Sequence, residues 1–244
     1  MPKLVFLATD IALYGLLVAI AFYVWHALST PTLRQTWRSV LHEPVAMSAA
    51  VVLLLFLVLA ALDSVHFRPL LPPAPGAAAD AAPAYSTRTL SLLDQLLAGP
   101  REAREKTYSI PLGTHQYSKE SMLVDGKSIR DFPRLQFGGS HLKDVDREWA
   151  EDVARRSITG LVGGAAGAAA LWLVVAALRA RSARTGVRES LRAIWLRTTD
   201  VPWRSILLTA SALVLFAGWV AALWPVYHVF GTDQTGNDVL FQAI

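Results

Sequence analysis

The sequence has no cysteine and little charge. Without a thiol among its 244 residues, the chain cannot form disulfide bonds, bind zinc through cysteine or use a cysteine nucleophile. Asp, Glu, Lys and Arg make up 17% of the residues, below the roughly 25% of an ordinary soluble domain. Because hydrophobic residues make up 53%, the composition argues against a single soluble globular domain.

Motifs of the common enzyme classes are also missing. The sequence contains no GxxxxGK[ST] phosphate loop, HExxH zinc motif, GxSxG nucleophile motif or GxGxxG dinucleotide motif. His66, His115 and His141 follow the second apolar segment, but their spacing matches no metal site. We interpret them as surface or turn histidines and expect no catalytic residue, no metal and no cofactor.

Four long apolar runs dominate the sequence. A membrane-spanning helix needs about 20 apolar residues, because the hydrocarbon core is about 30 Å thick and a helix rises about 1.5 Å per residue. Asp10 and Asp63 lie near helix ends, so we expect them at the membrane surface rather than at its centre. The first run is too long for a signal peptide, and we expect it to be retained. The four runs cover residues 4–28, 45–62, 158–178 and 205–229.

Arginines predict the orientation of these helices. Lys and Arg are enriched in cytoplasmic loops, so the loop after the third run should be cytoplasmic, together with residues 29–44. By alternation, the N-terminus, residues 68–157 and the tail after 229 face outside. This distribution accounts for the net charge of +4 without a nucleic-acid partner. The loop carries two acidic residues and seven arginines: Arg179, Arg181, Arg184, Arg188, Arg192, Arg197 and Arg204.

The predicted fold class is an all-α polytopic membrane protein with four transmembrane helices and a small α+β extracytoplasmic lobe between helices two and three. The predicted segments are helix 1 (1–28), an approach segment with helix 2 (29–67), the outer linker and lobe (68–157), helix 3 (158–180), the basic loop (181–204), helix 4 (205–229), and a turn with the start of a further helix (230–244).

Within the outer segment, composition predicts several parts. Residues 69–83 are rich in Pro and Ala and are typical of a semi-rigid spacer. Residues 89–97 have helical spacing, which Gly99-Pro100 should end. Residues 107–142 alternate short apolar and polar patches, and residues 143–156 are typical of a polar helix that continues into helix 3. The turn signals are Asp125-Gly126, Pro133 and Gly138-Gly139.

Small residues and a repeated pattern mark the helices. Gly160/Gly164 and Gly163/Gly167 are two pairs of small residues spaced four apart, which allow a neighbouring helix to approach closely. The neighbour can belong to this chain or to another. The stretches 37–44 and 195–202 both begin with Trp, end with Pro and precede an apolar run, which is typical of an internal duplication or of chance similarity between membrane helices.

The most informative string is HVFGTDQTGNDVLFQAI, from His228 to Ile244. Gly231 and Gly236 are typical turn residues. The apolar residues 239–241 should begin a helix. The polar residues between can cap the turn or that helix: Thr232, Asp233, Asn237 and Asp238.

This string closely resembles a signature of the C-type permease subunits of dipeptide, oligopeptide and nickel ABC importers, which reads like H-x-(L/F)-G-T-D-x-x-G-R-D-(V/L)-L. Asn237 departs from the pattern, because the family usually has Arg there. The resemblance covers residues 190–244 well and 34–71 weakly, but not the first helix or the outer lobe. The matching residues are His228, Phe230, Gly231, Thr232, Asp233, Gly236, Asp238, Val239 and Leu240.

The resemblance implies an importer in the bacterial inner membrane that passes peptides or similar solutes inward. Its partners would be a second permease subunit, cytoplasmic ATPase subunits and an extracytoplasmic solute-binding protein, besides the lipid bilayer. The family's further helices and EAA-type coupling loop, which docks on the ATPase, do not occur in this sequence. We therefore expect the N-terminal portion of a permease, which anchors and assembles the pathway and cannot transport alone.

An alternative is a membrane-anchored receptor or assembly protein whose outer lobe binds a partner. A lobe of about 60 residues buries little core by itself, so in either case it should lean on another surface. For the importer, we expect residues 84–150 to contact the solute-binding protein or cover the mouth of the pathway. An enzyme is the least favoured, because no nucleophile, base and orienting residue can be identified together.

Overall fold

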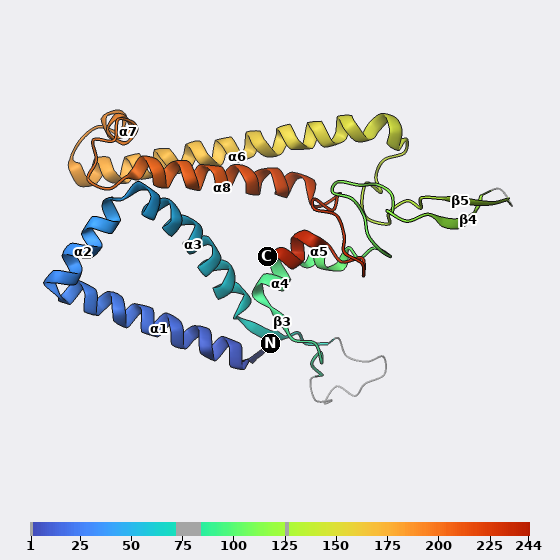
Figure 1. Ribbon diagram of the computed structural model, residues 1–244, viewed down its shortest axis with the longest axis horizontal. Coiled ribbons are helices and arrows are strands. Elements are labelled where there is room, and N and C mark those ends of the chain that lie inside the picture. Colours follow the sequence, from blue (N-terminus) through green and yellow to red (C-terminus); the bar gives the residue numbers. More distant parts are fainter. Residues whose placement is uncertain (1, 72–83, 125–126) are drawn as a thin grey trace, which may run out of the picture. The chain divides into compact units, whose positions relative to one another are not determined.

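The computed structural model of the protein describes residues 2–71, 84–124 and 127–244 (Figure 1). Most of the predicted spacer 69–83 and the predicted turn Asp125-Gly126 lie outside these residues. The chain divides into two compact units, Met1–Leu97 and Ala98–Ile244. The predicted fold class is confirmed: over the described residues the chain is mostly helical, with two small sheets and four helices long and apolar enough to cross a membrane.

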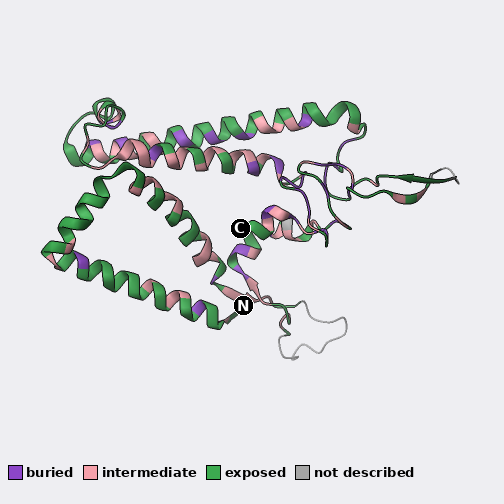
Figure 2. Cartoon of the chain, in the orientation of Figure 1, coloured by how far each residue is buried: buried purple, intermediate pink, exposed green. Residues whose placement is uncertain are grey.

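Three helices make up most of the first unit: α1 (Ala8–Ser29), α2 (Pro31–His42) and α3 (Pro44–Asp63). Proline begins α2 and α3, where its missing N–H is not needed and its fixed φ suits a helix. Nearly all of α1 and α3 is apolar and little of either is buried (Figure 2). Helices that are apolar on all sides and unburied in the protein are typical of membrane spans.

A small antiparallel sheet joins the start of α1 to the end of α3. Its strands are β1 (Lys3–Val5), β2 (His66–Arg68) and β3 (Leu90–Ser91). Beside it, Asp10 is 1% exposed, and its Oδ2 accepts the backbone N–H of Leu7 at 2.9 Å and lies 3.0 Å from Nδ1 of His66. Asp10 therefore caps α1 at its first turn. His66, predicted as a surface or turn histidine, lies in β2 and is largely buried beside this carboxylate.

The predicted helix over 89–97 is shorter in the structure. It begins after β3 as α4 (Leu92–Leu96), where Ser91 Oγ accepts the Asp94 N–H at 2.9 Å and Asp94 Oδ2 accepts the Ser91 N–H at 3.0 Å. This reciprocal capping box fixes the start of the helix. This helix ends before Gly99-Pro100, as predicted. These two residues lie within a further short helix, α5 (Ala98–Glu102), because Pro is tolerated in a first turn.

The second unit is built on a helical hairpin: α6 (Val145–Ala183), α7 (Val187–Trp195) and α8 (Trp203–Leu223). The polar stretch 143–156 and the third apolar run lie almost entirely in the single helix α6. The order of long helix, short amphipathic helix and long helix occurs in both units. It places Trp37 in α2 and Trp195 at the end of α7, each shortly before an apolar helix.

α6 and α8 lie side by side because glycines remove the side chains between them (Figure 1). A Cβ on Gly160 would lie 2.5 Å from the carbonyl oxygen of Gly218, and one on Gly164 would lie 2.9 Å from Cα of Leu215. The neighbour of this pair is thus in the same chain. The second pair differs, since Gly167 has one close neighbour and Gly163 has none within 4 Å.

The fourth apolar helix ends earlier than predicted. The prediction extended it to residue 229, but α8 ends at Leu223 with Trp224 as its cap. Pro225 explains the difference, because proline cannot donate the helical N–H bond and disfavours helical geometry in the residue before it. Residues 224–229 enter the lobe instead, where Tyr227 and His228 are each 2% exposed.

The lobe has less regular structure than predicted for residues 107–142. In its described part the regular elements are α5, the hairpin β4 (Glu120–Val124) and β5 (Lys127–Asp131), and α9 (Val239–Ala243). Isolated bridges pair Ser109 with both Gln116 and Thr232. Residues after α8 therefore complete the lobe, which is not built from the segment before helix 3 alone.

Candidate functional site

Residues 228–240, which carry the family-like motif, form one compact loop that leads from α8 into α9. Gly231 and Gly236 adopt positive φ angles of 76° and 78°. A Cβ at Gly231 would collide with the carbonyl oxygen of Ser109, and one at Gly236 with that of Glu105. Glycine is thus required at both positions for two reasons: the positive φ angle, and the close approach of another backbone segment.

Asp238 closes the motif loop and starts the next helix. Its Oδ1 accepts the backbone N–H of Leu240 at 2.8 Å and of Phe241 at 3.3 Å, which is the N-cap arrangement expected for aspartate. Its Oδ2 lies 2.7 Å from Nδ1 of His228. One carboxylate therefore serves both the helix start and a buried histidine.

His228 lies between two acidic side chains. Its Nε2 is 3.3 Å from Oε1 of Glu105, on the side opposite Asp238. Glu105 also accepts the backbone N–H groups of residues 136, 137 and 138 at 2.8, 2.7 and 3.1 Å. The three side chains are 2–6% exposed. We call His228, Glu105 and Asp238 the histidine cluster; it ties the motif loop to two other segments of the lobe.

The charges of the histidine cluster support one another. Burial lowers the pKa of His228, but hydrogen bonds to Asp238 and Glu105 and their negative charges outweigh it and raise the pKa from 6.5 to about 9. Burial raises the pKa of Glu105, but hydrogen bonds from His228 and from the three backbone N–H groups outweigh this effect and lower the pKa to about 2. At neutral pH the His228 ring is therefore protonated and the Glu105 carboxylate is ionised.

Asp233 and Asn237 organise the exposed side of the loop. Asp233 Oδ1 accepts the backbone N–H groups of Thr235 and Asn237 at 2.8 and 2.9 Å. Burial raises the pKa of Asp233, but these bonds and those from Gln242 together outweigh it and hold the pKa well below its usual range. Asn237 donates to the Thr235 hydroxyl at 2.6 Å. The neutral residue at the position of the family's Arg thus has a local role within the turn.

Thr232 joins the motif loop to the strand-like segment 107–109. Its hydroxyl donates toward the Thr107 carbonyl oxygen at 2.8 Å and lies 3.1 Å from the Ser109 hydroxyl. Glu105 and Ser109 were not identified from the sequence. Glu105 lies in the charged run REAREK, and such a run usually predicts a solvated surface. Its burial depends on backbone groups about thirty residues away, which no local pattern reveals.

A second polar cluster centres on Asp152 of α6, which is 6% exposed. Its carboxylate lies 2.8 Å from Nε2 of His141 and accepts the Tyr227 hydroxyl at 2.9 Å. Arg155 and Arg156 lie at 2.7 and 2.8 Å. His141 is exposed and lies in a turn, as predicted, and it also pairs with a buried carboxylate, which its spacing did not reveal. His115 contacts the neighbouring Thr114 hydroxyl.

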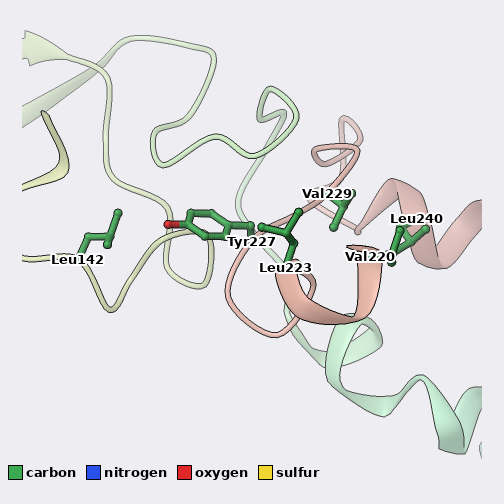
Figure 3. Packing of buried hydrophobic residues seen from close by; sticks show 6 residues of the cluster. All are labelled: Leu142, Val220, Leu223, Tyr227, Val229 and Leu240. Carbon is green, nitrogen blue, oxygen red and sulfur yellow. The ribbon is translucent and has the colours of Figure 1, made fainter. Parts of the chain in front are cut away.

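An apolar core lies beside both clusters and explains their burial. Figure 3 shows the aromatic ring of Tyr227 lying between Leu142 and Leu223. Side chains from the end of α8, from the motif loop and from α9 thus share one core with a lobe residue. The members of this core are Leu142, Val220, Leu223, Tyr227, Val229 and Leu240.

The two polar clusters stabilise the fold through hydrogen bonds and ion pairs. Each acidic group of the two clusters already accepts hydrogen bonds from fixed partners. Among the described residues, no group of three or more His, Asp or Glu side chains is arranged to hold a metal ion. Comparison of the chain with protein-family models, with curated proteins and with solved structures gave no match. The protein is a multi-pass membrane protein by its four apolar helices.

Proposed function

We propose that the protein is a membrane component of an ABC importer for peptides or similar solutes, located in the bacterial inner membrane. It anchors the outer lobe and helps to assemble the translocation pathway with a second permease subunit, cytoplasmic ATPase subunits and an extracytoplasmic solute-binding protein. The resemblance of the motif loop to the C-type permease signature supports this proposal.

The observation that carries the proposal is the position and construction of the motif loop. It follows directly on an apolar helix, as in the permease signature. Its His, Gly, Thr and Asp residues each have a distinct contact, and the histidine cluster joins the loop to Glu105 of the lobe. These contacts attach the outer lobe to the end of a membrane helix.

Uptake measurements test the proposal. A strain lacking the gene should take up a radiolabelled peptide more slowly, and the wild-type gene should restore uptake. The affinity-tagged protein should also co-purify with an importer ATPase subunit identified by mass spectrometry. Unchanged uptake of peptides and of nickel in the deletion strain, together with a purified complex that lacks any such ATPase, would contradict the proposal.

A receptor or assembly protein is the second candidate, and a groove in the lobe favours it. A cavity of about 560 Å³ is lined by Gln116, Tyr117, Phe132 and Trp149, among others. Tyr117 is 69% exposed, whereas Gln116 is 7% exposed and its buried Oε1 accepts no hydrogen bond from the described residues. An aromatic groove with a free acceptor is suited to a protein segment that brings an N–H group.

A photo-crosslinking amino acid at position 117 separates the two candidates. Crosslinks in intact cells to a solute-binding protein of an importer favour the permease component. Crosslinks to an unrelated membrane or extracytoplasmic protein favour the receptor.

A further inference from the structure

A pocket lies where the apolar part of α6 ends and α8 begins. Its volume is about 510 Å³, and it combines an apolar wall with polar groups. Leu178, which is 58% exposed, is the last residue of the third apolar run, and Arg179 follows it directly. The pocket therefore lies at the level where hydrocarbon gives way to headgroups. Its lining residues are Val175, Leu178, Arg179, Ser182, Ala183 and Trp203.

Two buried donors of this pocket have no acceptor. Nε of Arg179 and Nε1 of Trp203 are inaccessible and make no hydrogen bond within the described part of the chain. The guanidinium carbon of Arg179 lies 5.7 Å from the centre of the Trp203 ring, so the two side chains hold each other in place. Buried donors without acceptors are costly, and those of native proteins are usually satisfied by a ligand, an ion or water.

The charge around the pocket is unbalanced. None of the ion pairs found among the described residues involves an arginine of the segment 179–204, although this segment carries seven of them. Arg204, the neighbour of Trp203, stacks on Trp195 at 4.6 Å, and its buried Nε also finds no acceptor among the residues that the structure describes. An anion with several oxygen acceptors would satisfy these donors.

We propose that this pocket binds an anionic phospholipid, with its phosphate at Arg179 and Trp203 and its acyl chain along Val175 and Leu178. A guanidinium is well suited to phosphate because it offers fixed, diverging donors. Basic pockets between membrane helices are typical sites for anionic lipid headgroups. A free phosphate ion would leave the apolar wall unused, and a zwitterionic headgroup would bring its own cation among the arginines. The site is independent of the proposed importer function.

Thermal unfolding of the full-length protein in detergent tests the proposal. Short-chain phosphatidylglycerol is titrated against the wild type, with short-chain phosphatidylcholine and inorganic phosphate as separate comparisons. Phosphatidylglycerol should raise Tm in a saturable way, and the other two should have little effect. Arg179→Gln should weaken the apparent affinity about tenfold or more, because it removes a charge-assisted contact. The matched control is Arg188→Gln, which removes an equal charge from an exposed position on the same side.

Four results would overturn the proposal. Equal loss in Arg188→Gln would show general attraction to the basic segment, and equal stabilisation by inorganic phosphate would show a simple anion site. Equal stabilisation by phosphatidylcholine would show that the headgroup charge is irrelevant. If Arg179→Gln does not fold, Trp203→Phe replaces it, since this variant keeps an aromatic ring and removes the Nε1 donor. Unchanged phosphatidylglycerol affinity in that variant would also contradict the site.

Discussion

Nδ1 of His228 lies 2.7 Å from Oδ2 of Asp238, although the two residues are ten positions apart in the chain. The pair closes the motif loop at its base, and Glu105 completes it from another segment. Because the three side chains are almost inaccessible, loss of either ion pair should weaken the attachment of the loop to the lobe.

The first prediction concerns pH. The raised pKa of His228 means that its stabilising charge is fully present below about 6.5 and is lost as the pH rises through about 9. The lowered pKa of Glu105 means that its contribution is present above about 4.5 and is lost as the pH falls through about 2. We expect Tm in detergent to be highest between about pH 4.5 and 6.5 and to decline towards pH 9. In His228→Gln the decline towards pH 9 should be weaker; an unchanged profile would contradict the role of the histidine.

The second prediction concerns Asp238. Asp238→Asn preserves the shape of the side chain but removes its charge beside His228, and breaking a buried ion pair costs about 3 kcal/mol. The free energy of unfolding should fall by this amount in chemical denaturation, and hydrogen exchange should increase over residues 228–241. Gln234→Ala, at an exposed position of the same loop, is the control and should change neither measurement.

The third prediction concerns Gly236. Gly236→Ala forces a side chain onto a residue with positive φ and against the Glu105 carbonyl oxygen, so we expect a loss of more than about 2 kcal/mol in the free energy of unfolding. Gly99→Ala introduces the same methyl group into α5, where nothing lies within 4 Å. Similar stability of the two variants would show that the motif loop does not need its glycine.

The fourth prediction concerns the contact between α6 and α8. Gly160→Leu should overpack the contact with Gly218 and lower stability in detergent by about 3 kcal/mol. Gly163→Leu adds an equally large side chain to the same helix where no atom lies within 4 Å, and should be nearly neutral in the isolated protein. If Gly163→Leu is instead the more damaging in cells, its face of α6 contacts a partner helix.

The four apolar helices could be predicted because the thickness of the bilayer sets one length that a sequence run must satisfy. The turn conformation of Gly231 and Gly236 could also be predicted, because glycine is favoured where a turn requires a positive φ angle, which is a local property of the backbone. Glu105 could not, because its partners come from residues 136–138 and 228. The end of α8 was misplaced because apolarity continues to residue 229, whereas the helix ends at Leu223, shortly before Pro225.

The histidines show the same limit. His66 lies 56 positions after Asp10, and His141 lies 11 positions before Asp152 in an irregular segment. Their spacing predicted surface or turn histidines and gave no sign of these partners. In the structure each lies within 3.0 Å of a carboxylate that is almost fully buried. Long-range pairing of this kind depends on how the helix ends are brought together by the sheet and the lobe, which local periodicity does not encode.

The length of α6 has a mechanical consequence. Its 39 residues extend about 59 Å at about 1.5 Å per residue, about twice the thickness of the hydrocarbon core. The polar turns before residue 158 therefore form a stiff lever of about 20 Å, and Asp152 fastens the lobe to this lever through Tyr227 and His141. A tilt of the membrane-spanning part by about 10° would swing the far end of the lever by about 3 to 4 Å. Small rotations within the bilayer are thereby enlarged into displacements of the lobe.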